Sequence, residues 1–113
     1  MPMGMIEKRR YGRIYFKTPL HCKIRGETKG AYTVTEDLSP GGMGFIHERF
    51  IPARTHLMLE FNVLQKAVSS IARIAWTSSM GHTHTHRYGV EFLEIDQQSK
   101  NYLKDFFALK ASA

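Results

Sequence analysis

The chain has 113 residues, of which 42% are hydrophobic and 23% are charged. This length suits one domain with a modest core, and the composition is that of a globular protein, which excludes disordered and fibrous classes. Because 16 Lys and Arg oppose 10 Asp and Glu, the formal charge of +6 favours an anionic partner: a nucleic acid, a nucleotide or an acidic membrane surface.

The N-terminal residues predict a leader followed by a basic cluster. Residues 1–8 are expected to be a flexible leader, and the domain is expected to span residues 9–110. The basic cluster, residues 8–13, has the sequence Lys-Arg-Arg-Tyr-Gly-Arg, and its Gly12 disfavours a stable helix. The leader lacks the apolar run of a signal peptide, and no segment of the chain approaches the ~18 apolar residues of a membrane span. A cytoplasmic location is therefore expected.

From Thr18 onward, apolar and polar residues alternate with the period of β-strands. Leu20, Cys22 and Ile24 form the apolar side of a first strand, so the single cysteine is expected to be buried, and an internal disulfide is excluded. The same alternation predicts five further strands, over residues 31–35, 43–47, 57–62, 67–77 and 88–93. In the fifth strand, the residues expected to share one face are Val68, Ser70, Ala72, Ile74 and Trp76.

Beyond residue 95 the period becomes that of an α-helix. One apolar stripe carries Tyr102, Leu103, Phe106 and Phe107, whereas Lys100, Asn101, Lys104 and Asp105 face away from it. Asp96 is placed to cap the N-terminus of this helix. Six short strands followed by one amphipathic helix predict an all-β fold, a six-stranded antiparallel β-barrel with a C-terminal α-helix.

A turn within the β-rich part carries the first candidate site. Pro40 and Gly41 suit a type II turn, in which Gly41 takes a positive φ. Asp37 and Ser39 are two residues apart on a strand, so their side chains share a face beside Gly42, and the intervening Leu38 is expected to point into the core. A carboxylate and a hydroxyl beside bare backbone can accept hydrogen bonds from the N1–H and amino group of a guanine. Ordinary Asx and Ser turn chemistry explains the same residues equally well.

The basic cluster carries the second candidate site. An arginine fork binds phosphate oxygens or the O6/N7 edge of guanine in bidentate fashion, and it also stacks on a purine. Three of the four cations of the cluster are arginines, so the cluster as a whole is a candidate for binding such a ligand. The alternative interpretation is a solvated basic segment with no ligand.

Both sites resemble the motifs of the PilZ domain family. Arg9-x-x-x-Arg13 matches the family's RxxxR, and Asp37-x-Ser39-x-x-Gly42 matches its [D/N]xSxxG, in the expected order. Tyr88-Gly-Val-Glu-Phe92 is also similar to the family's glycine-containing late strand. The resemblance covers roughly residues 7–108, and it implies a six-stranded barrel that binds the bacterial second messenger cyclic di-GMP.

Carried over by position, the resemblance implies a role for each motif residue. Arg9 and Arg13 would bind the phosphates and guanine, Asp37 and Ser39 would recognise a guanine, and Gly42 would let the ligand approach. Outside the strict pattern, the helpers would be Lys8, Arg10 and Gly41.

The predicted function is a cyclic di-GMP receptor that is not an enzyme and needs no cofactor. The ligand would order the RxxxR segment against the barrel and so create a surface for a downstream protein. The four cations of residues 8–13 favour two bound nucleotides over one. Two alternatives are a PilZ-like adaptor that does not bind nucleotide, and a basic β-barrel that binds single-stranded nucleic acid with strong salt dependence. With the cyclic dinucleotide as ligand, no nucleic-acid partner is expected.

Three histidines alternate in a predicted hairpin loop, at His82, His84 and His86. Imidazole is a common metal ligand, and alternate residues of a strand share a face. Because no carboxylate or cysteine is close in sequence, a physiological metal site is not expected.

Overall fold

The computed structural model describes residues 13–81 and 83–112. The strands are β1 (Ile14–Tyr15), β2 (Pro19–Ile24), β3 (Ala31–Ser39), β4 (Gly42–His47), β5 (His56–Val63), β6 (Lys66–Ser79) and β7 (His86–Ile95), and the helix is α2 (Gln97–Ser112). Every predicted strand is present, and most extend beyond the predicted bounds. The largest extension is in β3, which continues through Ser39 as far as the turn.

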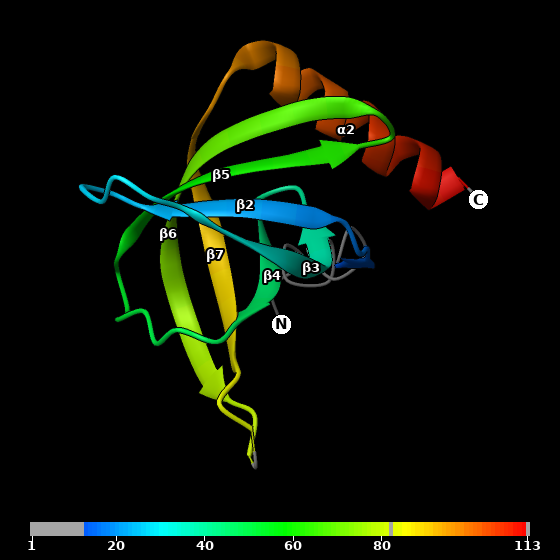
Figure 1. Ribbon diagram of the computed structural model, residues 1–113. Coiled ribbons are helices and arrows are strands. Elements are labelled where there is room, and N and C mark those ends of the chain that lie inside the picture. The colour runs from blue at the N-terminus through cyan, green and yellow to red at the C-terminus, as the bar shows by residue number, and fades with distance from the viewer. Residues whose placement is uncertain (1–12, 82, 113) are drawn as a thin grey trace, which may run out of the picture.

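The strands close into a barrel (Figure 1). Neighbouring strands pair in the order β3-β2-β5-β6-β7-β4, and β3 also pairs with β4, which joins the two ends of the sheet. All of these pairs are antiparallel. The six-stranded antiparallel barrel with a C-terminal helix is therefore confirmed. No helix of the described chain is long and apolar enough to cross a membrane.

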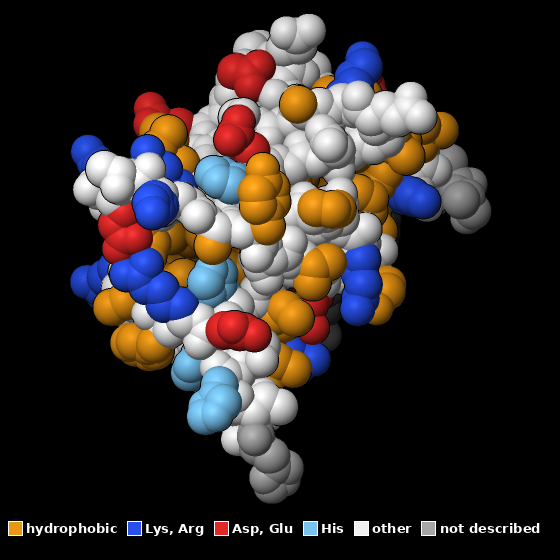
Figure 2. Space-filling view, in the orientation of Figure 1, with side chains coloured by type: hydrophobic (Ala, Val, Ile, Leu, Met, Phe, Trp, Pro, Cys, Tyr) orange, Lys and Arg blue, Asp and Glu red, His pale blue; other side chains and the backbone are white. Residues whose placement is uncertain are grey.

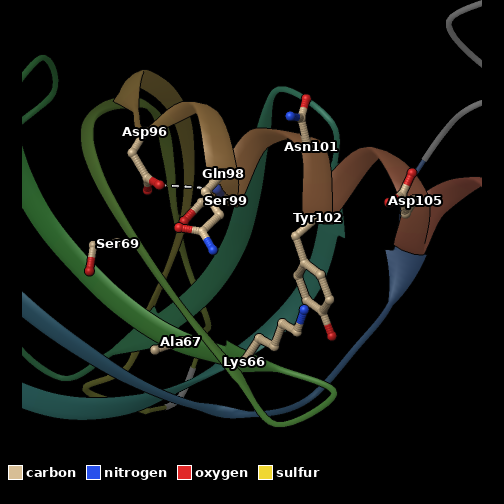
Figure 3. A pocket seen from close by; sticks show the side chains of 9 residues that line it. All are labelled: Lys66, Ala67, Ser69, Asp96, Gln98, Ser99, Asn101, Tyr102 and Asp105. Atoms are coloured by element: carbon tan, nitrogen blue, oxygen red, sulfur yellow. Dashed lines mark hydrogen bonds between the residues drawn. The ribbon is translucent and has the colours of Figure 1, made fainter.

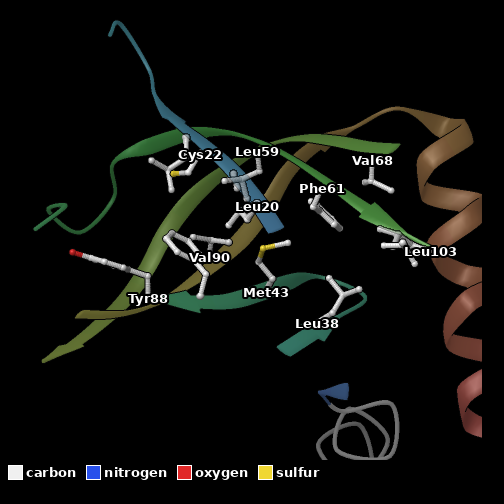
Figure 4. Close-up of a cluster of buried hydrophobic side chains, with 14 of the residues drawn as sticks. Leu20, Cys22, Leu38, Met43, Leu59, Phe61, Val68, Tyr88, Val90 and Leu103 are labelled. Carbon is white, nitrogen blue, oxygen red and sulfur yellow. The ribbon is translucent and has the colours of Figure 1, made fainter. Parts of the chain in front are cut away.

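Apolar side chains from all six barrel strands fill the interior, as Figure 4 shows. Leu20 on β2 and Phe45 on β4 are fully buried, as are Leu57 on β5 and Tyr88 on β7. The side chain of Cys22 is also buried, as predicted, and this burial raises the pKa of its thiol to about 11. The apolar residues of the alternating pattern thus form the inner surface of the barrel.

Helix α2 packs its predicted stripe against the barrel. Leu103, Phe106 and Phe107 are buried, and the ring of Phe106 meets that of Phe16 edge-on at 5.5 Å between centroids. The N-terminus of the helix is capped as predicted, because the Ser99 N–H donates to Asp96 Oδ2 at 3.1 Å.

Strand β1 was not predicted, because two residues are too few to show an alternation. It pairs with the part of β3 beyond the β2 pairing, so β1 and β2 lie in series along one edge of β3. The buried hydroxyl of Thr35 bridges the interval between them. It donates to the Phe16 carbonyl at 2.6 Å and accepts from the Thr18 N–H at 3.0 Å. One side chain thus satisfies backbone groups where the ladder is interrupted.

Register shifts place an extra residue in three of the strands. The extra residues are Glu36 on β3, Ala75 on β6 and Leu93 on β7, as the pairings on either side of each shift require. The shift at Ala75 corrects one prediction: Trp76 does not share the inner face with Ile74. Ile74 is 1% exposed and Trp76 is 41% exposed, because the added residue turns Trp76 outward.

The β3–β4 connection corrects a second prediction. Ser39 pairs directly with Gly42, which leaves Pro40 and Gly41 as a two-residue turn. Gly41 does not have the positive φ of a type II turn, since the described glycines with positive φ are Gly26 and Gly81. Instead, the Phe92 N–H donates to the Gly41 carbonyl at 2.8 Å. This hydrogen bond to β7 sets the turn's orientation, and it outweighs the local preference of the Pro-Gly pair.

Candidate functional site

A row of four residues with two glycines at its centre crosses the outer face of the barrel. Asp37, Gly44, Gly89 and Trp76 lie in one cross-strand row on β3, β4, β7 and β6. A Cβ added to Gly44 would lie 2.8 Å from Asp37 Oδ1, and a Cβ added to Gly89 would collide with the indole of Trp76. The carboxylate and the indole therefore lie over the two glycines, and they form a flat surface with one acidic and one aromatic end.

Arg13 joins the two ends of this row. Its Nη1 lies 3.2 Å from Asp37 Oδ1 and 3.3 Å from Asp37 Oδ2, and its guanidinium carbon lies 5.9 Å from the centroid of the Trp76 ring. The side chain of Arg13 is 49% exposed and that of Asp37 is 26% exposed. The structure thus brings the second arginine of one sequence motif onto the carboxylate of the other, at a position open to solvent.

Ser39 lies on the same outer face of β3, two residues from Asp37. Its hydroxyl is partly buried and donates to the Gly42 carbonyl at 3.2 Å. A Cβ on Gly42 would collide with the carbonyl oxygen of Val90, so the close approach of β7 already requires glycine there. The proposed role of Gly42 in admitting a ligand stays a prediction. In contrast, a Cβ on Gly41 would meet nothing within 4 Å.

The other predicted cations, Lys8, Arg9 and Arg10, lie outside the described residues. Of the basic cluster, the geometry of the site therefore rests on Arg13 alone.

Two further ion pairs lie on the same outer face. Arg73 Nε donates to Glu91 Oε1 at 2.8 Å, and Arg87 Nε lies 3.3 Å from Glu36 Oε1. Along β7, Glu91 and Arg87 flank Gly89, so the indole of Trp76 lies between the two pairs. An aromatic plane surrounded by guanidinium groups and carboxylates suits a planar ligand that carries both negative charge and N–H donors.

Trp76 is the functional candidate that the sequence interpretation missed. The alternation puts it on one face with Ile74, which favours a core or barrel-surface position over a base-stacking platform, since a β-bulge leaves no periodic signal. One available signal was Gly89, because a glycine inside a strand often marks the close approach of another group.

A separate polar cavity of about 510 Å³ lies between the start of β6 and the start of α2 (Figure 3). Several of its polar side chains have partners in the fold. Asp96 caps the helix, the Tyr102 hydroxyl donates to the Val63 carbonyl at 2.7 Å, and the Lys66 ammonium lies 4.7 Å from the centroid of the Tyr102 ring. These contacts explain the cavity as a structural junction.

No three His, Cys, Asp or Glu side chains among residues 13–81 and 83–112 come together in a way that could hold a metal ion. His82, the first of the three alternating histidines, lies outside the described residues. His86 begins β7 and pairs in register with His47 of β4.

Comparison with solved structures identifies similar folds. The Bacillus subtilis inhibitor of motility MotI (DgrA) superposes with a TM-score of 0.76 at 13% identity, over 91% of this chain and 50% of that one. The chain thus spans about half the length of that protein. The PilZ domain of CeSA from a cellulose-synthesizing bacterium gives a TM-score of 0.63 at 20% identity, over 88% of this chain and 98% of that one. The PilZ domain of Escherichia coli YcgR, determined with c-di-GMP, gives 0.67 at 22% identity, over 88% of each chain.

Comparison with curated protein sequences gives no significant match. A family model described as PilZ domain matches residues 7–109, which include both motifs and the whole barrel. This match covers nearly the entire sequence, and the chain therefore belongs to the PilZ domain family.

Proposed function

We propose that this chain is a cytoplasmic receptor for cyclic di-GMP, and not an enzyme, which binds its ligand over the outer face of β3, β4, β7 and β6. The observation that carries the proposal is the contact of Arg13 with both Asp37 and Trp76. This contact joins one residue from each family motif to the exposed indole of Trp76. Family membership and the bound nucleotide of the YcgR domain support the choice of ligand.

Each described side chain has a distinct part in the proposed recognition. The Asp37 carboxylate accepts hydrogen bonds from the N1–H and amino group of one guanine, and Ser39 adds a hydroxyl beside it. Trp76 offers a ring on which a base stacks. Gly44 and Gly89 leave room for the Asp37 carboxylate and the Trp76 indole to lie against the sheet. Guanine is selected over adenine because adenine presents no N1–H donor.

Arg13 exchanges partners when the ligand binds. An ion pair as exposed as Arg13–Asp37 contributes only about 0–1 kcal/mol, so opening it costs little. Each charge-assisted hydrogen bond to the nucleotide then contributes roughly 1.5–3 kcal/mol. Arg13 binds a phosphate or the guanine O6/N7 edge, and Asp37 becomes free for the other edge of the base.

The rest of the basic cluster completes the proposed complex. Arg9, with Lys8 and Arg10, adds phosphate contacts, and ordering this segment costs on the order of 2–5 kcal/mol. The balance suits a micromolar dissociation constant, about −8 kcal/mol. Two stacked nucleotides make the best use of four cations. The ordered RxxxR segment and the barrel together form the surface that a downstream protein binds.

Isothermal titration with cyclic di-GMP tests the proposal. The wild-type chain is expected to bind in the micromolar range and to prefer cyclic di-GMP to cyclic di-AMP. Arg13→Ala is expected to weaken binding, whereas Arg25→Ala, an exposed change in the β2–β3 turn, leaves it unchanged. Absence of heat with wild type at tens of micromolar would refute nucleotide binding and favour an adaptor that works by protein contact alone.

A salt series separates this proposal from single-stranded nucleic acid as the ligand. Non-specific binding through the phosphate backbone falls steeply with salt and shows little base preference. Tight, salt-sensitive binding of an oligonucleotide, together with no preference for the cyclic dinucleotide, would replace the receptor assignment with nucleic-acid binding.

A further inference from the structure

A second concave surface lies where α2 meets the end of β7 and the β3–β4 turn. This groove encloses about 990 Å³. Its apolar lining comes from Phe92, Leu93, Ile95, Leu103 and Phe107. Leu93, the extra residue of the β7 bulge, is 40% exposed. The bulge therefore turns a large aliphatic side chain out of the barrel and into the groove.

The charges of α2 are divided between the two sides of the helix. Lys100 and Lys104, one turn apart and both exposed, line the groove. Asp105 lines the separate polar cavity on the other side, together with the capping Asp96. Glu94 is the one acidic residue among those that line the groove. The helix thus presents a basic rim above an apolar floor.

We propose that this groove binds an acidic amphipathic helix of a partner protein. Apolar residues at helical spacing would enter the floor, and carboxylates beside them would pair with Lys100 and Lys104. The lining of α2 from Gln97 to Ala108 spans roughly 17 Å, which suits about three turns of a partner helix.

The sheet edge at the groove is short. A strand that adds to a sheet needs an edge with free backbone groups. The pairing of β7 with β4 ends at Glu91, and the Phe92 N–H donates to the Gly41 carbonyl, so only the last residues of β7, after Phe92, lack a strand partner on that side. An added strand would therefore form few backbone hydrogen bonds there, whereas the apolar floor and the two lysines follow α2 over about three turns.

This inference names the chemistry of the downstream partner, and so its biological meaning rests on the proposed function. Its physical test does not, because the groove shares no residue with Arg13, Asp37 or Trp76. The two surfaces adjoin at the β3–β4 hairpin, where Pro40 and the predicted helper Gly41 form part of the groove wall, and along β7, where Phe92 of the groove follows Glu91.

The test is a titration of the ¹⁵N-labelled full-length chain with three synthetic amphipathic peptides of about four helical turns. All share one leucine face, and their polar faces carry glutamate, glutamine or lysine. The glutamate peptide is expected to bind at least about fivefold more tightly than the lysine peptide. The amides that shift are expected to be those of Leu93, Leu103, Lys104 and their neighbours in the groove.

Two variants with the same change in net charge separate the groove from general attraction to a basic protein. The Lys100→Glu/Lys104→Glu variant is expected to reverse the preference. The Arg25→Glu/Lys29→Glu variant, changed in the exposed β2–β3 turn, keeps it. That turn contributes no residue to the lining of the groove. Leu93→Ser is expected to weaken all three peptides, with thermal melting to show that the fold is retained.

Three results would overturn the proposal. The first is equal loss of preference in both charge-reversed variants, which indicates non-specific attraction. The second is peptide-induced shifts confined to another face, or none at all. The third is a groove already filled, shown by concentration-dependent shifts without peptide for a second copy, or by nuclear Overhauser contacts from residues 1–12. A chain that binds cyclic di-GMP normally and fails here refutes the groove alone.

Discussion

Arg13 lies across both carboxylate oxygens of Asp37, at 3.2 and 3.3 Å. The pair links the residue that precedes β1 to the strand that carries the second motif. The proposed ligand would use the same carboxylate oxygens for a guanine, so its binding would break this contact. The affinity of the proposed receptor for cyclic di-GMP would then depend on how readily the Arg13–Asp37 ion pair opens.

The first prediction concerns the carboxylate itself. Asp37→Ala is expected to weaken cyclic di-GMP binding by about 10- to 150-fold, which corresponds to the loss of one charge-assisted contact. Asp37→Asn, which the family motif also permits, is expected to retain part of the affinity through its amide oxygen. Isothermal titration measures both. Urea unfolding should show little loss of stability in either variant, because the Arg13–Asp37 pair is exposed. Wild-type affinity in Asp37→Ala would place the ligand elsewhere.

The second prediction uses Trp76, which is the only tryptophan of the chain. Stacking of a guanine on its exposed ring is expected to quench the intrinsic fluorescence as cyclic di-GMP is added. Trp76→Ala is expected to cost about 1–3 kcal/mol of binding, the usual range for a base on an aromatic ring. Fluorescence titration gives the first result and calorimetry gives the second. An unchanged emission spectrum at saturation would remove Trp76 from the site.

The third prediction contrasts two adjacent glycines. Gly42→Ala is expected to destabilise the fold by about 1–3 kcal/mol, because the new methyl group would collide with the Val90 carbonyl. Gly41→Ala is expected to stay within about 0.5 kcal/mol of wild type, since its Cβ would enter open space and its φ is not positive. Urea denaturation at constant m-value gives both numbers. Equal stability of the two variants would contradict the strand packing described here.

The fourth prediction concerns the buried thiol. Burial raises the pKa of Cys22 to about 11 from an ordinary value near 9.0, with Arg49 opposing the shift. A raised pKa in the folded chain stabilises the fold fully below pH 9.0, and this contribution is lost between pH 9.0 and about 11. The free energy of unfolding should therefore fall across that range. A Cys22→Ala variant should lack this part of the slope, whatever its stability at neutral pH.

A companion measurement checks the accessibility of the same thiol. At pH 8 the native chain should react slowly with a disulfide reagent, because the thiol is buried and protonated. Addition of denaturant should raise the rate to that of a free cysteine. Rapid reaction in native buffer would contradict the burial.

The sequence predicted those features of the fold that repeat regularly. Alternation located all six barrel strands, and the helical stripe and the Asp96 cap located α2. It could not locate β1, whose two residues are held by pairing with β3 rather than by a pattern of their own. It also put Trp76 on one face with Ile74, because a bulge at Ala75 changes the face without changing the composition. The type II turn failed for a similar reason, since a hydrogen bond from β7 decided the conformation of Gly41.

For the candidate site, the motifs predicted which residue types matter, and the fold supplied their relation in space. Arg13 and Asp37 are far apart in sequence. They are in contact because β1 pairs with β3 and places Arg13 on the outer face beside Asp37. Pairing of so short a strand depends on long-range contacts, which no local pattern contains.

The buried hydroxyl of Thr35 has a mechanical consequence. Its hydrogen bonds to the Phe16 carbonyl and the Thr18 N–H hold the backbone on the C-terminal side of β1 against β3. A rearrangement of the arginine segment would therefore take place on the N-terminal side of Phe16. The conformational change would then be confined to the short segment that carries the arginines, and the barrel itself would keep its structure.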